Sequence, residues 1–151
     1  MTTVPLRLLT AFLLLAPPLA VAAPAIAIAA AWARATPPGV TTAAAYLTVT
    51  NDGAADRLLG ASSPAARQLL LHAEVEEQDT QHMRQLASLE VPAHASVELS
   101  PGHMHLMLVG IAAPLKPDET IKVTLHFENV GDITLDVPVR DGRPPAEHHH
   151  H

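Results

Sequence analysis

Four side chains with nitrogen or sulfur donors form one spaced set in this 151-residue chain: His72, Met83, His105 and Met107. Ten residues separate the first two, twenty-one separate the next two, and one separates the last two. Imidazole and thioether are neutral, polarisable donors that suit monovalent copper, whereas hard cations prefer oxygen and zinc rarely accepts a thioether. Because the chain has no cysteine, this set is its plausible soft-metal site, and it predicts copper(I) binding.

Two of the donors lie on a segment that alternates like a β-strand, residues 103–109. Leu106 and Leu108 take one face and are expected in the core. His105 and Met107 then take the other face, which we expect to point outward. A thioether that shares a face with imidazole lacks the usual packing reason for methionine.

The other two donors lie earlier in the chain. Residues 68–76 also alternate, and His72 falls on the polar face, where it is expected to be a surface-side imidazole. Met83 follows the polar run of residues 76–81 and is expected at a loop tip. One donor from this strand and one from the neighbouring loop could close the site at the end of a sandwich.

Alternatives remain for individual donors. His82 and His103 lie next to, or two residues from, the proposed ligands, and either could replace one or add a nitrogen site that favours copper(II). The opposing interpretation is that Met83 and Met107 only fill gaps in the core, as methionine most often does, and that the histidines are solvated.

The first residues have the pattern of a secretory signal. Arg7 precedes the apolar residues 8–15, and small residues then lead to an expected cleavage after Ala22 or Ala23. We assign residues 1–22 to a signal peptide, with an uncleaved membrane anchor as the alternative, although the apolar run is short for a bilayer span. The mature chain is therefore expected in the periplasm, without membrane insertion.

The remaining chain is acidic. Beyond residue 22 it has eight Lys and Arg against fifteen Asp and Glu, a net charge of −7 with neutral histidines. This balance argues against nucleic acid and anionic lipid as partners and favours basic proteins or metal ions. About 128 residues suit one domain, which we place at residues 23–140 and expect to be monomeric. Residues 141–151 form a polar tail that ends in His148–His151, either a natural secondary copper(II) site or an expression tag.

Short alternating segments separated by Pro and Gly predict an all-β fold. The clearest are residues 121–128 and 133–140, which the turn at 129–132 joins into a hairpin with one buried face. Further extended segments are expected at residues 43–51, 57–62, 68–76, 83–89, 96–99 and 103–111. Since no helical periodicity is sustained after the signal, we predict a Greek-key antiparallel β-sandwich or barrel.

The four donors match at full spacing the signature of the periplasmic copper chaperone family PCu(A)C, and other stretches resemble that family. They are residues 31–39, 44–51, 114–116 and 137–140. The resemblance implies a cupredoxin-like β-sandwich that holds one copper(I) near its surface through His72, Met83, His105 and Met107. It also implies delivery toward the binuclear copper centre of cytochrome c oxidase, with a Sco-type thiol chaperone or oxidase subunit II as partner.

Other functions fit the residues less well. A blue-copper electron carrier requires a cysteine thiolate, which this chain lacks. A hydrolase requires a nucleophile and base with recognisable spacing, and a copper oxidase requires more histidines in an open site, so we expect no enzymatic activity. The remaining alternatives are an interaction or adhesion module of the same fold and a copper-storage protein with no delivery role.

Overall fold

The computed structural model describes residues 25–142, and the regular structure in that part of the chain is entirely β-strand. The predicted signal at residues 1–22 and the histidines at 148–151 lie outside the described residues. Within residues 25–142 there is no helix long and apolar enough to cross a membrane. The strands are β1 (Ile26–Arg34), β2 (Thr42–Asn51), β3 (Asp56–Ser62), β4 (Ala66–Glu77), β5 (Thr80–Leu86), β6 (Leu89–Val91), β7 (Ala95–Leu99), β8 (Met104–Ile111), β9 (Thr120–Phe127) and β10 (Asp132–Arg140).

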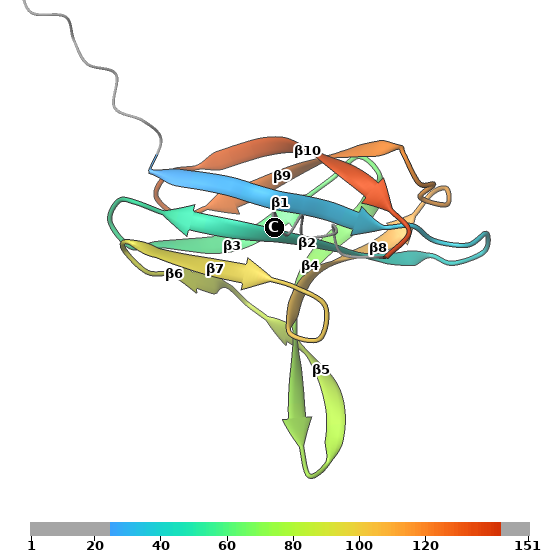
Figure 1. Cartoon of the computed structure of the whole chain (residues 1–151), viewed down its shortest axis with the longest axis horizontal. Helices are drawn as coiled ribbons and strands as arrows, with labels where there is room; N and C mark the ends of the chain where they lie inside the picture. Colours follow the sequence, from blue (N-terminus) through green and yellow to red (C-terminus); the bar gives the residue numbers. More distant parts are fainter. Residues whose placement is uncertain (1–24, 143–151) are drawn as a thin grey trace, which may run out of the picture.

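Seven of these strands form a closed barrel in the order β4-β8-β2-β1-β10-β9-β3 (Figure 1). A contact between Ala61 of β3 and Leu69 of β4 closes the ring. β5, β6 and β7 pair with β4, β3 and β2 respectively, outside that ring. The predicted all-β fold is therefore confirmed, and closure leaves few exposed sheet edges.

The sequence pattern did not predict β1, and its single segment at residues 83–89 corresponds to the end of β5 and the start of β6. The residues of β1 are mostly alanine, which has a low strand propensity, and its alternation is interrupted by a bulge between Ala29 and Trp32, where Ala30 has a φ of 51°. Pairing with β2 on one side and β10 on the other holds it in the sheet. The β1–β10 pair is parallel, so the pairing is not antiparallel throughout.

One hydrophobic core fills the barrel. β9 buries every second residue from Ile121 to Phe127, as its alternation predicted. Leu106 and Leu108 of β8 are both 0% exposed and belong to the same core. The opposite face of β8 and of the strands beside it is therefore left for polar side chains.

A buried carboxylate joins two distant turns. Asp56 is 4% exposed and accepts hydrogen bonds from the backbone N–H groups of Arg57, Asn129 and Val130 at 2.7, 2.9 and 3.0 Å. Burial alone would raise the pKa of this carboxyl, but these donors together hold the pKa below its ordinary value. Asp56 thereby connects the start of β3 to the β9–β10 turn.

We expect Asp56→Ala to lower the free energy of unfolding at pH 7 by about 2 kcal/mol, because three partly buried N–H groups lose a charged acceptor. The contribution of Asp56 is present above the carboxyl's unfolded pKa and is lost as the pH falls through the lowered folded pKa. Urea unfolding at pH 7 and pH 3 measures both effects. Asp52→Ala, at an exposed position of the preceding turn, is the control, and equal stability of the two variants at pH 7 would contradict this account.

Candidate metal centre

Three adjacent strands carry the four predicted donors. In the β4–β8 ladder His72 lies opposite His105, and in the β4–β5 ladder Met83 lies opposite Glu74, two residues beyond His72. Residues directly opposite in a ladder share a face, as do residues two apart on a strand. His72, Met83, His105 and Met107 therefore all lie on the face of β5, β4 and β8 that points away from the core.

The two imidazoles form the centre of this face. The ring centroids of His72 and His105 are 5.7 Å apart, with an angle of 67° between the ring planes. The Nδ1 atom of His72 is buried and has no hydrogen-bond partner. Buried polar atoms nearly always have a partner, so this nitrogen is suited to a ligand bound between the strands.

His105 is more enclosed than the sequence predicted. It lies on the expected face, but its side chain is only 5% exposed, so the expectation of an imidazole open to solvent is wrong. The cause is Tyr46 of β2, whose ring centroid lies 6.3 Å from that of His105 and 4.7 Å from that of Trp32. Tyr46, with Trp32 packed against it, covers His105 from the side of β2.

Burial and charge favour the neutral form of the His105 imidazole. Burial lowers the pKa of His105, the neighbouring His72 lowers it further, and Glu74 opposes both effects. Burial also raises the pKa of Tyr46, against the opposing charge of Arg34. At neutral pH, His105 therefore offers a lone pair without first losing a proton, while Tyr46 remains a phenol.

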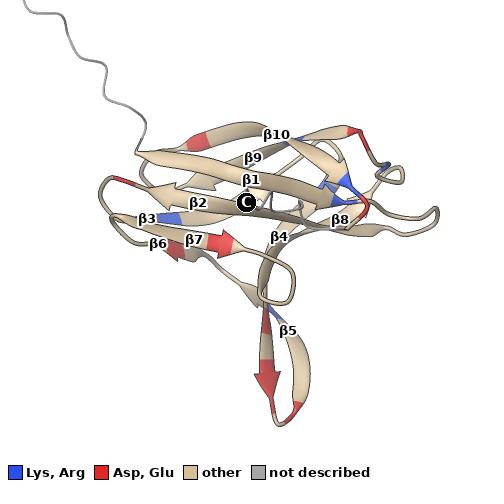
Figure 2. Ribbon diagram, viewed as in Figure 1, with Lys and Arg blue, Asp and Glu red and all other residues tan. Residues whose placement is uncertain are grey.

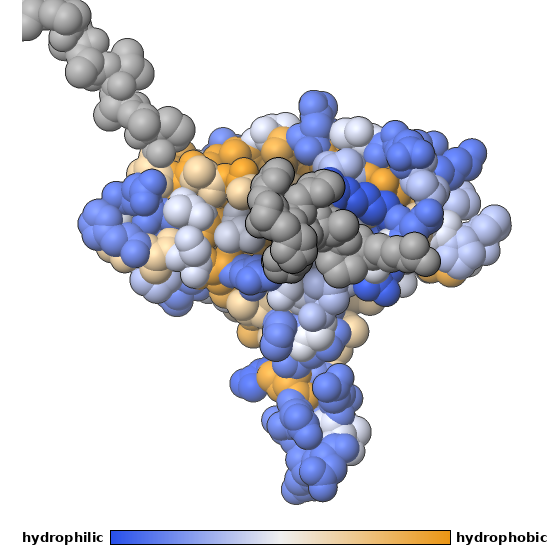
Figure 3. Space-filling model, viewed as in Figure 1, coloured by the Kyte–Doolittle hydropathy of each residue, from blue (hydrophilic) through white to orange (hydrophobic). Residues whose placement is uncertain are grey.

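Met83 does not lie at a loop tip, as the sequence predicted, but within β5. The tip is the two-residue turn at Gln78 and Asp79, which have φ angles of 53° and 60°. Turns of this kind usually contain glycine or asparagine, so Gln-Asp gave no turn signal. The β4–β5 hairpin extends away from the barrel (Figure 1), and its far end is hydrophilic (Figure 3). Met83 lies between that end and the barrel, and its side chain is 54% exposed.

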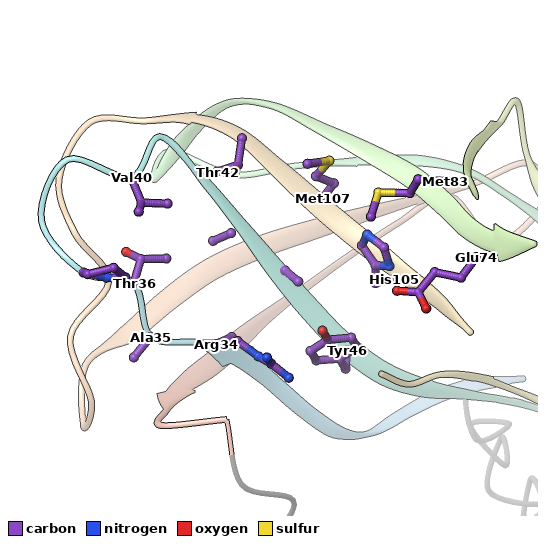
Figure 4. A pocket seen from close by; sticks show the side chains of 13 residues that line it. Arg34, Ala35, Thr36, Val40, Thr42, Tyr46, Glu74, Met83, His105 and Met107 are labelled. Carbon is purple, nitrogen blue, oxygen red and sulfur yellow. The ribbon is translucent and has the colours of Figure 1, made fainter. Parts of the chain in front are cut away.

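A hollow of about 330 Å³ opens beside the donors. Figure 4 shows Met83, Met107 and His105 on one side of it and Val40 at the far side. Its other lining residues include Tyr46, which as the chain's one tyrosine was expected to pack in the core or to cover the edge of the site. They also include Arg34 and Glu74, which the sequence analysis did not assign to the site. Of these two, only Glu74 had a signal in the sequence, because it follows His72 by two residues in an alternating strand.

The two alternative histidines are placed differently from the four donors. His82 lies opposite Val75 in the β4–β5 ladder, so it is on the other face of the hairpin from Met83. His103 is exposed just before β8, and its carbonyl oxygen accepts a hydrogen bond from the Glu74 N–H at 2.6 Å. Of the four predicted donors, Met83, His105 and Met107 line the hollow, whereas neither His72 nor His103 is among its lining residues.

Within residues 25–142, no group of three or more His, Asp or Glu side chains gathers closely enough to hold a metal ion. The two imidazoles of this face share it with the thioethers of Met83 and Met107, and a donor set of this kind favours a soft monovalent ion.

A separate hydrogen-bonded row of side chains across β3, β9 and β10 has the residue types of a hydrolase. Ser62 Oγ lies 3.0 Å from His126 Nε2, and His126 Nδ1 lies 2.7 Å from Asp132 Oδ1. Ser62 and Asp132 are exposed, and Thr124 and Thr134 hydrogen-bond beside them at 2.9 Å. Because water screens the exposed pair, we assign this row to cross-strand stabilisation and not to catalysis.

The fold and this donor face define a small all-β protein with a candidate soft-metal site of histidine and methionine. The sequence matches the family described as "Putative lipoprotein LpqE-like" over residues 26–139. It is also 36% identical over 118 residues to "Putative lipoprotein Lxx21020" of Leifsonia xyli subsp. xyli (strain CTCB07), covering 77% of this chain and 70% of that protein. The chain belongs to the LpqE-like family, which corresponds to the PCu(A)C resemblance stated above.

Solved structures agree with this assignment. The copper-bound PCuAC domain from PmoF2 is similar with a TM-score of 0.66 and 30% identity, over 80% of this chain and 96% of that one. The solution structure of CuI-DR1885 from Deinococcus radiodurans is similar with a TM-score of 0.65 and 29% identity, over 83% and 84% of the two chains. The predicted cupredoxin-like fold class is thereby confirmed.

The lowered pKa of His105 has a consequence for the metal-free protein. Because the pKa of His105 is lower in the folded protein, its imidazole binds a proton more readily in the unfolded state. The free energy of unfolding should therefore fall as the pH drops below about 6.5, the ordinary pKa of histidine. We expect His105→Asn to reduce the stability difference between pH 7.5 and pH 5.5. Denaturant unfolding at both values measures it, with the exposed His94→Asn as control. An unchanged difference in His105→Asn would contradict the assignment.

Proposed function

We propose that this chain is a copper(I) chaperone that works outside the cytoplasm. Its ligands are the imidazoles of His72 and His105 and the thioethers of Met83 and Met107. The observation that carries the proposal is that all four residues lie on one face of three paired strands, where the Nδ1 atom of His72 is buried and has no hydrogen-bond partner. Copper(I) is cargo in this proposal, and the chain has no enzymatic role.

The donor chemistry supports reversible holding. Four neutral donors leave the bound ion with its single positive charge, and a d¹⁰ ion makes little geometric demand on them. The ligands differ in enclosure, since His105 is 5% exposed and Met83 is 54% exposed. An incoming ligand can therefore displace the outer thioether while the inner imidazole still holds the ion.

The comparisons support copper as the cargo. One similar structure is titled as copper-bound and another as carrying copper(I), both with identities near 30%. The curated relative is named as a lipoprotein, which agrees with a site outside the cytoplasm. A chain without cysteine also suits an oxidising compartment, where a thioether does not form disulfides.

We propose delivery by ligand exchange to an acceptor that offers thiolate. Following the resemblance, the acceptors are a Sco-type chaperone or subunit II of cytochrome c oxidase, in the periplasm. A thiolate is a stronger soft ligand than a thioether, so transfer in this direction is favourable. A secondary copper(II) site at His82, His103 or the terminal histidines stays a prediction.

The double variant Met83→Leu, Met107→Leu tests the ligand set. Leucine keeps the volume and removes the sulfur donor, so we expect the fold to persist. Loss of a residue that only hydrogen-bonds to a metal ligand typically weakens metal affinity by about 10–100-fold, and loss of two ligands should weaken copper(I) retention by at least that much. Competition with a chromogenic copper(I) chelator under anaerobic conditions measures retention, and thermal unfolding checks the fold.

Met104→Leu is the matched control, because Met104 is on the same strand but on the core-facing side. It should retain copper(I) like the wild type. If the double variant also retains copper(I) like the wild type, the thioethers are not ligands and the proposal is wrong. An interaction module, in contrast, would keep its function in both variants.

A further inference from the structure

Two arginines stand at one side of the hollow. Arg34 lines it, and Arg140 lies opposite Arg34 in the parallel β1–β10 ladder. Figure 2 shows positive charge at the ends of these two strands. Like charges opposite each other destabilise a sheet, and within residues 25–142 neither guanidinium forms an ion pair with a carboxylate. The charges of the two arginines therefore do not stabilise this strand pair, which suggests that the Arg34 charge acts on something that binds in the hollow.

Exposed apolar side chains border the same hollow. Val40 is 38% exposed and Met83 is 54% exposed, and they belong to its lining. Figure 4 shows them at opposite sides, with Arg34 and Tyr46 along the wall between. Large apolar side chains that flank a concave surface are typical of a protein contact. The rim thus combines two apolar positions with one cation.

The two sides of the hollow, the β4–β5 hairpin and the end of β1, differ in charge. The β4–β5 hairpin carries the exposed carboxylates Glu76 and Glu77 and is negative in Figure 2. An anion is repelled from that side and attracted from the side of Arg34. Glu74 is the acidic residue of the lining and lies next to His105, on the hairpin side.

We propose that this hollow is the docking site of the copper acceptor, a protein loop whose cysteine thiolate enters between Val40 and Met83 and is guided by Arg34. The inference rests on the proposed function and adds the route of entry, the residue that selects an anionic ligand, and the apolar contacts of the acceptor. Thiolate is the biological copper(I) ligand that is both soft and anionic, which is what the lining and its cation fit.

The exchange step is balanced without any electron transfer. The acceptor thiol gives its proton to water, and the thiolate sulfur donates an electron pair to copper(I), which remains monovalent. The bond from the Met83 sulfur breaks first, because this side chain is on the exposed hairpin, and the bond from the buried His105 breaks last. The released donors are neutral, so no proton or counter-ion has to follow the copper(I).

The test compares two thiols of opposite charge as acceptors, glutathione and cysteamine. The protein is loaded with copper(I), and anaerobic stopped-flow mixing gives the transfer rate to each thiol. We expect Arg34→Gln to slow transfer to glutathione about three- to fivefold at low salt and to leave cysteamine unchanged or faster, with Arg34→Lys restoring the wild-type rate. The difference should vanish near 1 M salt, where the screening length is about 3 Å.

Val40→Asp places a negative charge at the same rim, in an exposed loop, and should slow glutathione and speed cysteamine. Lys122→Gln is the control, since it removes one exposed positive charge from β9, distant in the strand order, and should slow neither thiol. The inference is overturned if Arg34→Gln affects both thiols equally or behaves like Lys122→Gln.

Retention against the chelator is measured first for every variant, which separates the two proposals. If the wild type does not retain copper(I), the proposed function is wrong and the docking inference is wrong with it. If retention is intact but the rates do not depend on Arg34, only the docking inference is wrong.

Discussion

The pairing of β4 with β8 in one register is the constraint on which the site depends. It places His72 opposite His105 and Leu71 opposite Leu106. The face with the leucines packs in the core, and the opposite face carries the two imidazoles. A slip of one residue would turn the imidazoles into the core and the leucines outward. Because burial of those leucines fixes the register, the stability of the barrel and the geometry of the site have the same cause.

Around this pair the site divides into an enclosed half and an open half. His105 is enclosed by Tyr46, which packs on Trp32, whereas Met83 stands on a hairpin that has no core of its own. A carrier needs both properties, since tight enclosure of every ligand would slow release and full exposure of every ligand would weaken holding. Met107 is half-buried and borders the same hollow as His105 and Met83.

The sequence predicted what depends on alternation and spacing, and it missed what depends on the neighbours of a strand. The faces of β8 and β4 followed from the period of two, and so did the core positions of β9. The enclosure of His105 did not, because Tyr46 is about sixty residues away in the chain and reaches it only through the β2–β8 pairing. β1 was missed because its alanines fit a strand only once β2 and β10 flank them.

X-ray absorption on the copper(I)-loaded protein tests the central claim most directly, because sulfur and nitrogen scatter differently in the first coordination shell. The account predicts a monovalent ion with two sulfur and two nitrogen neighbours, and loss of both sulfur neighbours in the Met83→Leu, Met107→Leu variant. A shell of nitrogen and oxygen alone in the wild-type protein would contradict it.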